Sequence, residues 1–515
     1  MLNFDLKNYG VDYLLVNSTN KFLLEYVPIE ENLCHKLTGF TGEVGDALVC
    51  PDGKILLFVD SRFHIQADRE VDHTIVEVVK LQLGQKIDEE IVLRVPVGAT
   101  FGVVGECITQ SRLDRLIAFL SILKAEIKLV DIDLPESYCG VIEDVPQCLT
   151  GRTTQEKIKS MNGNYLITQS EELSYLLNIR SFSKEYSSQV NGKLLIVDSE
   201  PILFTDFISD ISRPISEFEE YISAIPMPIQ VDRGSVSAKD YSLINNPVNI
   251  SSPIKKMKSI KTSGEIEHFK DCFARTDKAL RATRDWIYAT DNITEFDIKS
   301  ELENNFKKFG AKYQSFHSIV GRNENSALAH YNKTDNHTIL GDSDLVLIDC
   351  GAYYEGGLAT DITRVFVKGE PTQLQKKVYT TVLKTFLNAF SYEVRVNTSG
   401  FEIDKYARVV MDSNLIDGFA FSHGLGHGIG VSVHEAPPNL SKNEIAKSIL
   451  EDNMCFTIEP GLYCEGFFGV RLENSCYLEN GKIKSFSKMC YEKKLIEMSL
   501  LNDFEKKVLE NFEVI

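Results

Sequence analysis

The hydrophobic and polar positions of this chain fall into three successive patterns. In the first, over residues 1–140, short apolar runs at 47–60, 74–81 and 100–106 alternate with an amphipathic run at 109–124. Short apolar runs bounded by turn residues are typical of strands, whereas apolar residues three and four positions apart are typical of helices. The first pattern therefore predicts an α/β domain.

The same alternation begins again in the second pattern and predicts another α/β domain, over 141–255. Its helices are expected at 154–162 and 170–179, and its strands at 165–168 and 193–206. The two domains are therefore similar in size and in fold class.

The third pattern, over 256–515, predicts a larger domain that contains both helices and strands. It is preceded by 244–261, a stretch rich in proline, serine and lysine that we interpret as a linker. Thr262 and Glu265 have the spacing of a capping box at the start of a long helix. Further helices are expected at 294–310, near 371–395 and at 400–415.

Four carboxylates in this third domain stand at the ends of apolar runs. Asp349 follows VLI, and Asp361 precedes ITRVFV after a glycine-rich turn; Glu459 follows CFTI, and Glu473 lies in VRLEN. Two adjacent antiparallel strands joined by such a turn would direct Asp349 and Asp361 toward one point. Taken alone, the two aspartates are explained as well by turn and capping roles.

A glycine-rich segment, SHGLGHGIGVSVHE, contains His423, His427 and His434. Glycines at this density allow the backbone to approach other groups closely, so we expect a loop rather than a helix. One histidine as a metal ligand, with the others in supporting or substrate-binding positions, fits this arrangement.

Together these residues form a candidate ligand set of four carboxylates and one imidazole. So much anionic oxygen in one buried place requires cations to neutralise it. A carboxylate-rich set suits Mn²⁺, Mg²⁺ or Ca²⁺, and the imidazole favours a transition metal such as Mn²⁺. Two such ions can activate a shared hydroxide, which predicts a hydrolase. The five predicted ligands are Asp349, Asp361, His427, Glu459 and Glu473.

Three further residues are candidates for supporting roles. Arg471 faces the same side as Glu473 by strand alternation, and could orient another carboxylate, although a surface Arg–Glu pair is an alternative. The hydroxyl of Tyr463 could bind a substrate oxygen, or the ring could simply pack in the core. His330 stands at the end of an element, between an apolar and a polar run.

Composition narrows the class of protein further. The chain has 515 residues, of which 43% are hydrophobic and 25% charged, and its formal net charge is −19. This length suggests about three domains, and the negative charge argues against a nucleic-acid partner. We expect neither a membrane span nor a signal peptide, and a cytoplasmic protein. The 11 cysteines, without a CxxC pair, are read as mostly buried thiols, including Cys350 and Cys455.

The ligand motifs, in this order and with these flanking residues, resemble those of the pita-bread metallopeptidases. Within that family the chain is most similar to the long, three-domain Xaa-Pro aminopeptidases, through FLLEYVPIEENLCHKLTGFTGEVGDALV and LITQSEELSYLLNIRSFSKEY as well. The resemblance implies two creatinase-like domains, over 1–140 and 141–255, followed by a pita-bread catalytic domain over 256–515. The interval between Asp349 and Asp361 is one residue longer than in these relatives, which a glycine-rich turn should absorb.

The resemblance also implies a role for each candidate residue. The five ligands would hold two Mn²⁺ ions, with Asp361 and Glu473 bridging them, and Glu459 would also transfer the proton. The histidines His330 and His434 would contact the scissile peptide and its oxyanion. The residues in supporting positions would be His423, Tyr463 and Arg471.

The implied activity is release of the N-terminal residue from short peptides that have proline in second position. A homodimer is also implied. Two alternatives remain, a prolidase acting on Xaa-Pro dipeptides and a non-catalytic peptide-binding module that retains the fold. We expect no nucleic-acid or membrane partner for any of them.

Overall fold

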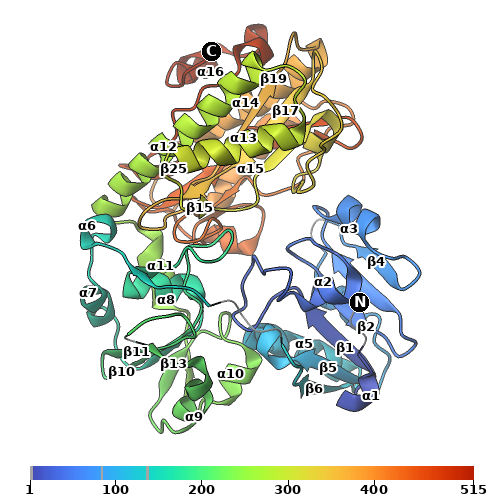
Figure 1. Ribbon diagram of the computed structural model, residues 1–515, viewed down its shortest axis with the longest axis vertical. Coiled ribbons are helices and arrows are strands. Elements are labelled where there is room, and N and C mark those ends of the chain that lie inside the picture. Colours follow the sequence, from blue (N-terminus) through green and yellow to red (C-terminus); the bar gives the residue numbers. More distant parts are fainter. Residues whose placement is uncertain (1–3, 83–84, 135–138, 211) are drawn as a thin grey trace. The chain divides into compact units, whose positions relative to one another are not determined.

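The computed structural model describes residues 4–82, 85–134, 139–210 and 212–515, which form two compact units (Figure 1). The first unit contains the chain up to Ile142 together with Thr154–Leu177 and Val190–Pro253. The second contains Glu143–Thr153, Asn178–Gln189 and Ile254–Ile515. The three domain ranges expected from the sequence stay a prediction.

The first unit contains two mixed six-stranded sheets. In the first sheet, with the order β4-β3-β2-β1-β5-β6, β1 pairs antiparallel with β2 and parallel with β5. Leu14 and Val16 of β1 belong to one apolar cluster and Leu15 to another, so both faces of the sheet are covered. The strands are β1 Tyr13–Asn17, β2 Asp46–Val49, β3 Ile55–Val59, β4 Val76–Lys80, β5 Thr100–Val104 and β6 Glu126–Val130. The helices are α1 Leu6–Tyr9, α2 Leu33–Thr38, α3 His64–Glu70, α4 Ile87–Val92 and α5 Gln110–Ile122, with the 3₁₀ turn η1 Gly105–Cys107.

The second sheet has the order β12-β11-β10-β8-β13-β14 and confirms the second α/β pattern. Its strands are β8 Tyr165–Ile167, β10 Lys193–Val197, β11 Glu200–Phe204, β12 Ser212–Arg213, β13 Ile229–Val231 and β14 Pro247–Asn249. The accompanying helices are α7 Thr154–Lys159, α8 Ser170–Leu177, η2 Ile215–Glu217, α9 Phe218–Ser223 and α10 Ala238–Ser242.

The stretch 244–261 is more structured than the linker interpretation suggests. It contains β14, which pairs with β13 at the edge of the sheet, and the helix α11 Pro253–Ser259. Proline is tolerated on an edge strand and at the first position of a helix, so its presence did not exclude either element. The boundary between the units nevertheless falls inside this stretch, after Pro253.

The second unit is organised around a central sheet with the order β16-β17-β19. Val346 and Ile348 of β17 pack toward α12 and α13, whereas Leu345 and Leu347 pack toward α14 and α15. All six residues of β17 are buried because helices cover both faces. The central strands are β16 Ile319–Arg322, β17 Leu345–Cys350 and β19 Ile362–Val367, and the helices are α12 Ser263–Ala289, α13 Glu295–Lys308, α14 Gln373–Phe390, α15 Gly400–Asp412 and α16 Asp503–Leu509.

A three-stranded sheet, β22-β25-β26, and two-stranded ladders complete this unit. The predicted capping box at Thr262 and Glu265 is confirmed at the start of α12. The strands are β7 Glu143–Asp144, β9 Ile179–Arg180, β15 Tyr313–Gln314, β18 Ala352–Tyr353, β20 Gly426–His427, β21 Asn439–Leu440, β22 Cys455–Ile458, β23 Gly461–Cys464, β24 Phe468–Arg471, β25 Asn474–Glu479 and β26 Lys482–Ser485. The short helices are α6 Gln147–Thr150, η3 Asn323–Ala327, η4 Glu444–Lys447, η5 Lys493–Leu495 and η6 Met498–Leu500.

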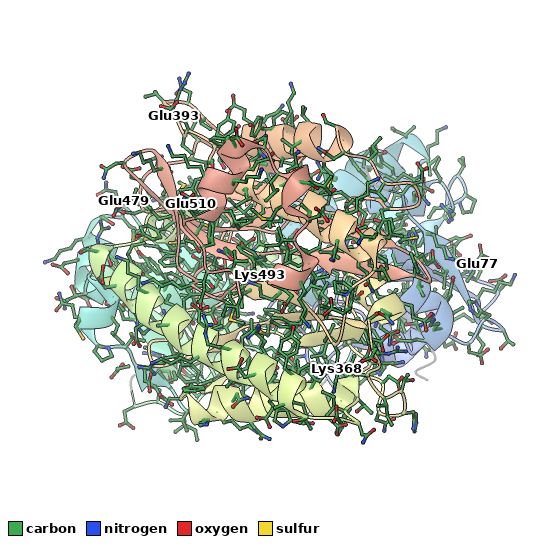
Figure 2. The ribbon with its side chains drawn as sticks, turned by 90° about the horizontal axis from the view of Figure 1, so that it is seen from above. Glu77, Lys368, Glu393, Glu479, Lys493 and Glu510 are labelled. Atoms are coloured by element: carbon green, nitrogen blue, oxygen red, sulfur yellow. The ribbon has the colours of Figure 1, made fainter. Side chains whose placement is uncertain are left out.

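Charged side chains mostly lie at the surface, as Glu393, Glu479 and Glu510 do in Figure 2. Among the residues that the structure describes, no disulfide joins the cysteines, and most of them are buried, including Cys350 and Cys455, as predicted. Within the described ranges, we find no helix whose length and apolar character would let it cross a membrane.

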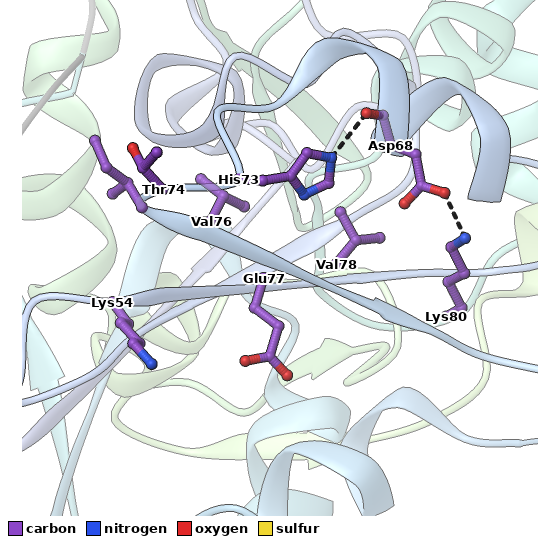
Figure 3. A pocket seen from close by; sticks show the side chains of 9 residues that line it. Lys54, Asp68, His73, Thr74, Val76, Glu77, Val78 and Lys80 are labelled. Carbon is purple, nitrogen blue, oxygen red and sulfur yellow. Dashed lines mark hydrogen bonds and ion pairs between the residues drawn. The ribbon is translucent and has the colours of Figure 1, made fainter.

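The first unit has a surface pocket of about 410 Å³ beside β4 (Figure 3). His73 and Asp68 line it, and an ion pair joins Lys80 to the Asp68 carboxylate. The pocket contains none of the residues predicted to be functional, which all lie in the second unit.

One buried charge helps to hold the strands of the second unit together. Arg364 of β19 is fully buried, and its guanidinium donates five hydrogen bonds of 2.6–3.1 Å. The acceptors are the carbonyl oxygens of Thr363, Glu473, Met489 and Cys490 and the side-chain oxygen of Asn474. The arginine therefore joins β19 to β25 and to the segment after β26.

We expect Arg364→Met to destabilise the second unit strongly, because four buried carbonyl groups would lose a donor. The free energy of unfolding should fall by about 3 kcal/mol or more, measured by urea denaturation. Arg395→Met is the control, since Arg395 is exposed and its guanidinium forms an ion pair with neighbouring Glu393. Equal denaturation midpoints for the two variants would contradict this role of Arg364.

Candidate metal centre

Antiparallel pairing of two central strands brings the two aspartates together. Asp349 lies near the end of β17 opposite Thr363 of β19, and Asp361 immediately precedes β19. In the connecting turn Gly356 and Gly357 have φ values of +81° and +64°, which only glycine adopts readily. Both aspartates are at most 9% exposed. The turn thus places two buried carboxylates at the same end of the strand pair.

The two glutamates flank another antiparallel pair in the same way. Glu459 follows β22 and Glu473 precedes β25, where Ile458 pairs with Asn474. The backbone N–H of Glu473 donates to the carbonyl of Thr363 at 3.2 Å. This hydrogen bond joins the beginning of β25 to β19 and so brings the two pairs of carboxylates into one cluster.

His427 presents one ring nitrogen to this cluster. Its Nδ1 donates to the carbonyl oxygen of Gly428 at 3.0 Å, which leaves Nε2 as the acceptor nitrogen. Nε2 is 3.5 Å from Oδ2 of Asp361 and 3.7 Å from Oε1 of Glu459. Asp361, His427 and Glu473 each offer a ligand atom, and these atoms lie within 4.8 Å of one another. This tautomer and spacing suit an imidazole that binds a metal through Nε2.

Arg471 binds one of the carboxylates and two hydroxyl groups beside the cluster. Its guanidinium donates to Oδ2 of Asp349 at 2.5 Å, to the hydroxyl of Tyr463 at 2.8 Å and to Oγ1 of Thr363 at 3.1 Å. Because Arg471 is only 4% exposed, the alternative of a surface Arg–Glu pair is wrong. The arginine orients a different carboxylate, that of Asp349, as the strand phase indicated.

A chain of hydrogen bonds extends from this arginine in both directions. The Thr363 hydroxyl donates to Oε2 of Glu473 at 2.7 Å. On the other side, Nε2 of His423 lies 2.8 Å from the Tyr463 hydroxyl, and its Nδ1 faces the carbonyl of Gly424. Burial raises the pKa of Tyr463 to about 12, although Arg471 opposes the shift. Tyr463 therefore stays protonated, and its hydroxyl can donate a hydrogen bond to Nε2 of His423.

Two carboxylate oxygens in the cluster lack a hydrogen-bond donor among the described residues, which bears on whether cations would fit the site. Oδ1 of Asp349 and Oε1 of Glu473 are buried without a hydrogen-bond partner in the part of the chain that the structure describes. Burial, followed by repulsion from neighbouring carboxylates, raises the pKa values of Asp361 and Glu473 well above their usual range. One arginine does not offset four carboxylates, so divalent cations fit both the charge and the unused oxygens.

Two further predicted histidines, His434 and His330, lie in the same unit. The rings of His434 and His427 meet almost perpendicularly, with centroids 4.3 Å apart. His330 lies in the turn after η3 and is partly buried. Its contact with substrate, and the other individual roles, stay predictions.

The sequence interpretation missed three residues that support the site. Thr363 links Arg471 to Glu473, and the hydroxyl of Thr457 accepts a hydrogen bond from the backbone of His427 at 3.1 Å. Thr363 was detectable, because it stands two residues after Asp361 and so shares its side of the strand. Glu435 follows His434 directly, but its ion-pair partner Lys261 is 174 positions away.

Comparison with known proteins supports a metallopeptidase. Residues 267–480 match the model of metallopeptidase family M24, and this range holds all five predicted ligands. This part of the chain belongs to metallopeptidase family M24. The predicted family is thereby confirmed.

Three relatives extend the similarity over nearly the whole chain. A probable Xaa-Pro aminopeptidase P of Laccaria bicolor is 25% identical, covering 98% of this chain and 87% of the relative. Xaa-Pro aminopeptidase 1 of Dictyostelium discoideum is 26% identical, covering 98% and 91%. The structure of a cytosolic X-prolyl aminopeptidase with a di-nuclear active site from Caenorhabditis elegans has a TM-score of 0.89 at 21% identity, covering 97% and 91%. The predicted fold class, α/β domains followed by a pita-bread domain, is confirmed.

We expect Thr363→Val to weaken metal binding while preserving the shape of the side chain. Glu473 and Arg471 would each lose a hydrogen-bond partner, and loss of such support typically lowers metal affinity about 10- to 100-fold. Titration calorimetry of chelator-treated protein with Mn²⁺ measures this change. Thr363→Ser, which retains the hydroxyl, is the matched control, and equal affinities for all three proteins would exclude this role.

Proposed function

We propose that this protein is a metal-dependent aminopeptidase that releases the N-terminal residue from peptides with proline in second position. The observation that carries the proposal is the buried cluster of four carboxylates and His427, with its two unused carboxylate oxygens. Relatives named as Xaa-Pro aminopeptidases, similar over nearly the whole chain, support the choice of substrate.

Five residues of the cluster would hold two divalent cations. A set rich in carboxylates with one imidazole favours Mn²⁺. When bound, such a pair of cations supplies an activated water and polarises a peptide carbonyl. The proposed ligands are Asp349, Asp361, His427, Glu459 and Glu473.

Glu459 is the residue best placed to move protons. Its side chain is 19% exposed, more than those of the other carboxylates in the cluster, and lies 3.7 Å from His427 and 3.9 Å from His423. It would accept a proton from the attacking water at a carboxylate oxygen. It would then deliver that proton to the proline nitrogen as the C–N bond breaks.

The remaining histidines would bind the peptide rather than the cations. His434, which contacts His427, would donate to the scissile carbonyl, where negative charge develops. His330 would contact the same peptide unit. His423 would be oriented by Tyr463, and Tyr463 in turn by Arg471.

Specificity for proline has a physical basis. A peptide bond to proline has no N–H, and the ring fixes φ, so the proline cannot donate the backbone hydrogen bond by which many peptidases hold an extended substrate. An enzyme that recognises the free amino group and the ring instead would cleave bonds that other peptidases leave intact.

Three further parts of the proposal concern organisation and location. Creatinase-like domains over 1–140 and 141–255 would precede the catalytic domain over 256–515. A homodimer follows from the family resemblance alone. A cytoplasmic location agrees with the mostly buried cysteine thiols and with the cytosolic relative from Caenorhabditis elegans.

We expect chelator-stripped protein to release arginine from Arg-Pro-Pro only after Mn²⁺ is added. Asp361→Asn should lower kcat/KM more than about 100-fold, since loss of a ligand exceeds loss of supporting contacts. Asp412→Asn, at an exposed position at the end of α15, is the control and should remain fully active.

The same assay distinguishes the alternatives. Cleavage of Gly-Pro without cleavage of Arg-Pro-Pro would establish a prolidase instead. No turnover of either peptide with any divalent metal would exclude both enzymes and favour a peptide-binding module.

A further inference from the structure

A buried carboxylate that belongs to no predicted ligand set lies behind the histidine loop. The side chain of Glu435 is 1% exposed, and those of Lys258 and Lys261 are 1% and 3% exposed. Nζ of Lys261 donates to Oε1 of Glu435 at 2.7 Å, and Nζ of Lys258 lies 3.7 Å from Oε2. Although burial alone would raise the pKa of Glu435, the two lysines hold it at about 2. Glu435 is therefore charged throughout the physiological range.

The loop from Gly428 to Glu435 is closed by Glu435 itself. Its backbone N–H donates to the carbonyl of Gly428 at 2.8 Å, and its Oε2 accepts from the N–H of Val431 at 2.8 Å. A Cβ at Gly430 would lie 2.0 Å from Oε1 of Glu435, so the backbone there must pass directly over the carboxylate. The glycines expected to bring the backbone close to another group do so here, and that group is Glu435.

Both ends of this loop carry a histidine of the site. His427 precedes Gly428, and His434 precedes Glu435, and their rings are in contact. Lys261 is fixed in turn, because its Nζ also donates to the carbonyl of Lys258 at 2.6 Å and its N–H donates to the carbonyl of Asn453 at 3.0 Å. The loop is thus anchored to the segment that joins α11 to α12.

We propose that Glu435 is a positioning residue that, held by Lys261 and Lys258, closes the loop 428–435 and so sets His434 against His427. The effect on turnover rests on the proposed function, but the effect on the two rings does not. A role in overall stability alone would not require the carboxylate to contact the loop backbone between the histidines. Displacement of a reacting contact by about 1 Å costs on the order of 100-fold in rate.

We expect Glu435→Gln to displace both rings, because the amide cannot pair with two buried ammonium groups. NMR spectra of protein labelled at histidine Cε1 would show this in the absence of metal, with signals assigned by His427→Gln and His434→Gln. Both signals should shift in Glu435→Gln, and kcat should fall about 10- to 100-fold with a smaller change in KM. Glu435→Asp, which keeps the charge, should recover part of both effects.

Glu451→Gln is the matched control, because it breaks the exposed ion pair between Glu451 and Lys256. Lys256 lies on α11, as Lys258 does. Should Glu435→Gln fail to fold, Lys261→Met leaves Glu435 paired with Lys258 and should shift the same two signals. Unchanged His427 and His434 signals in the folded variant, even with a lowered melting temperature, would overturn the proposal. If the wild-type protein cleaves no peptide, the proposed function fails, while the NMR result still decides the role of Glu435.

Discussion

Electrostatic repulsion among four carboxylates is the constraint on which the site depends. Asp361 and Glu473 are almost completely buried, and the raised pKa values of both show that the surrounding protein opposes their charge. Arg471 supplies one positive charge and uses it mainly on Asp349. The fold therefore maintains a place whose negative charge is balanced only when cations bind, which explains why so many of its hydrogen bonds serve to hold carboxylates still.

The strands make this arrangement possible, because each carboxylate lies at or next to a strand end and not in a free loop. Antiparallel pairs bring their ends together in the correct register, and the hydrogen bond from Glu473 to Thr363 joins one pair to the other. Helices on both faces bury the central strands, so those ends cannot shift without disturbing two apolar clusters. Rigid strands thus fix the four carboxylates, whereas the imidazole of His427 comes from a glycine-rich loop that needs its own support.

The long helices and the carboxylate cluster are predictable from the sequence. Short elements and contacts between distant residues are not, because no local pattern encodes them. The helices α12 to α15 follow from apolar periodicity and capping, and the carboxylates are visible because charged residues at the ends of apolar strands are costly. The composition of 244–261 indicates a linker, and β14 and α11 within it are too short to show a period that would oppose this interpretation. Pairings such as Lys261 with Glu435 join residues 174 positions apart, and no local pattern records them.

The glycine-rich loop illustrates how these two kinds of information combine. Its composition indicated a close approach of the backbone to some group, but only the structure identifies that group as the carboxylate of Glu435. Two buried lysines keep this carboxylate ionised, and an ionised acceptor binds backbone N–H groups more strongly than a neutral one. A loop that must be glycine-rich to wrap around an anion, and therefore has little intrinsic rigidity, gains its rigidity from that anion. The ion-paired cluster of Glu435 with its two lysines and the two histidines at the ends of the loop are therefore parts of one connected arrangement.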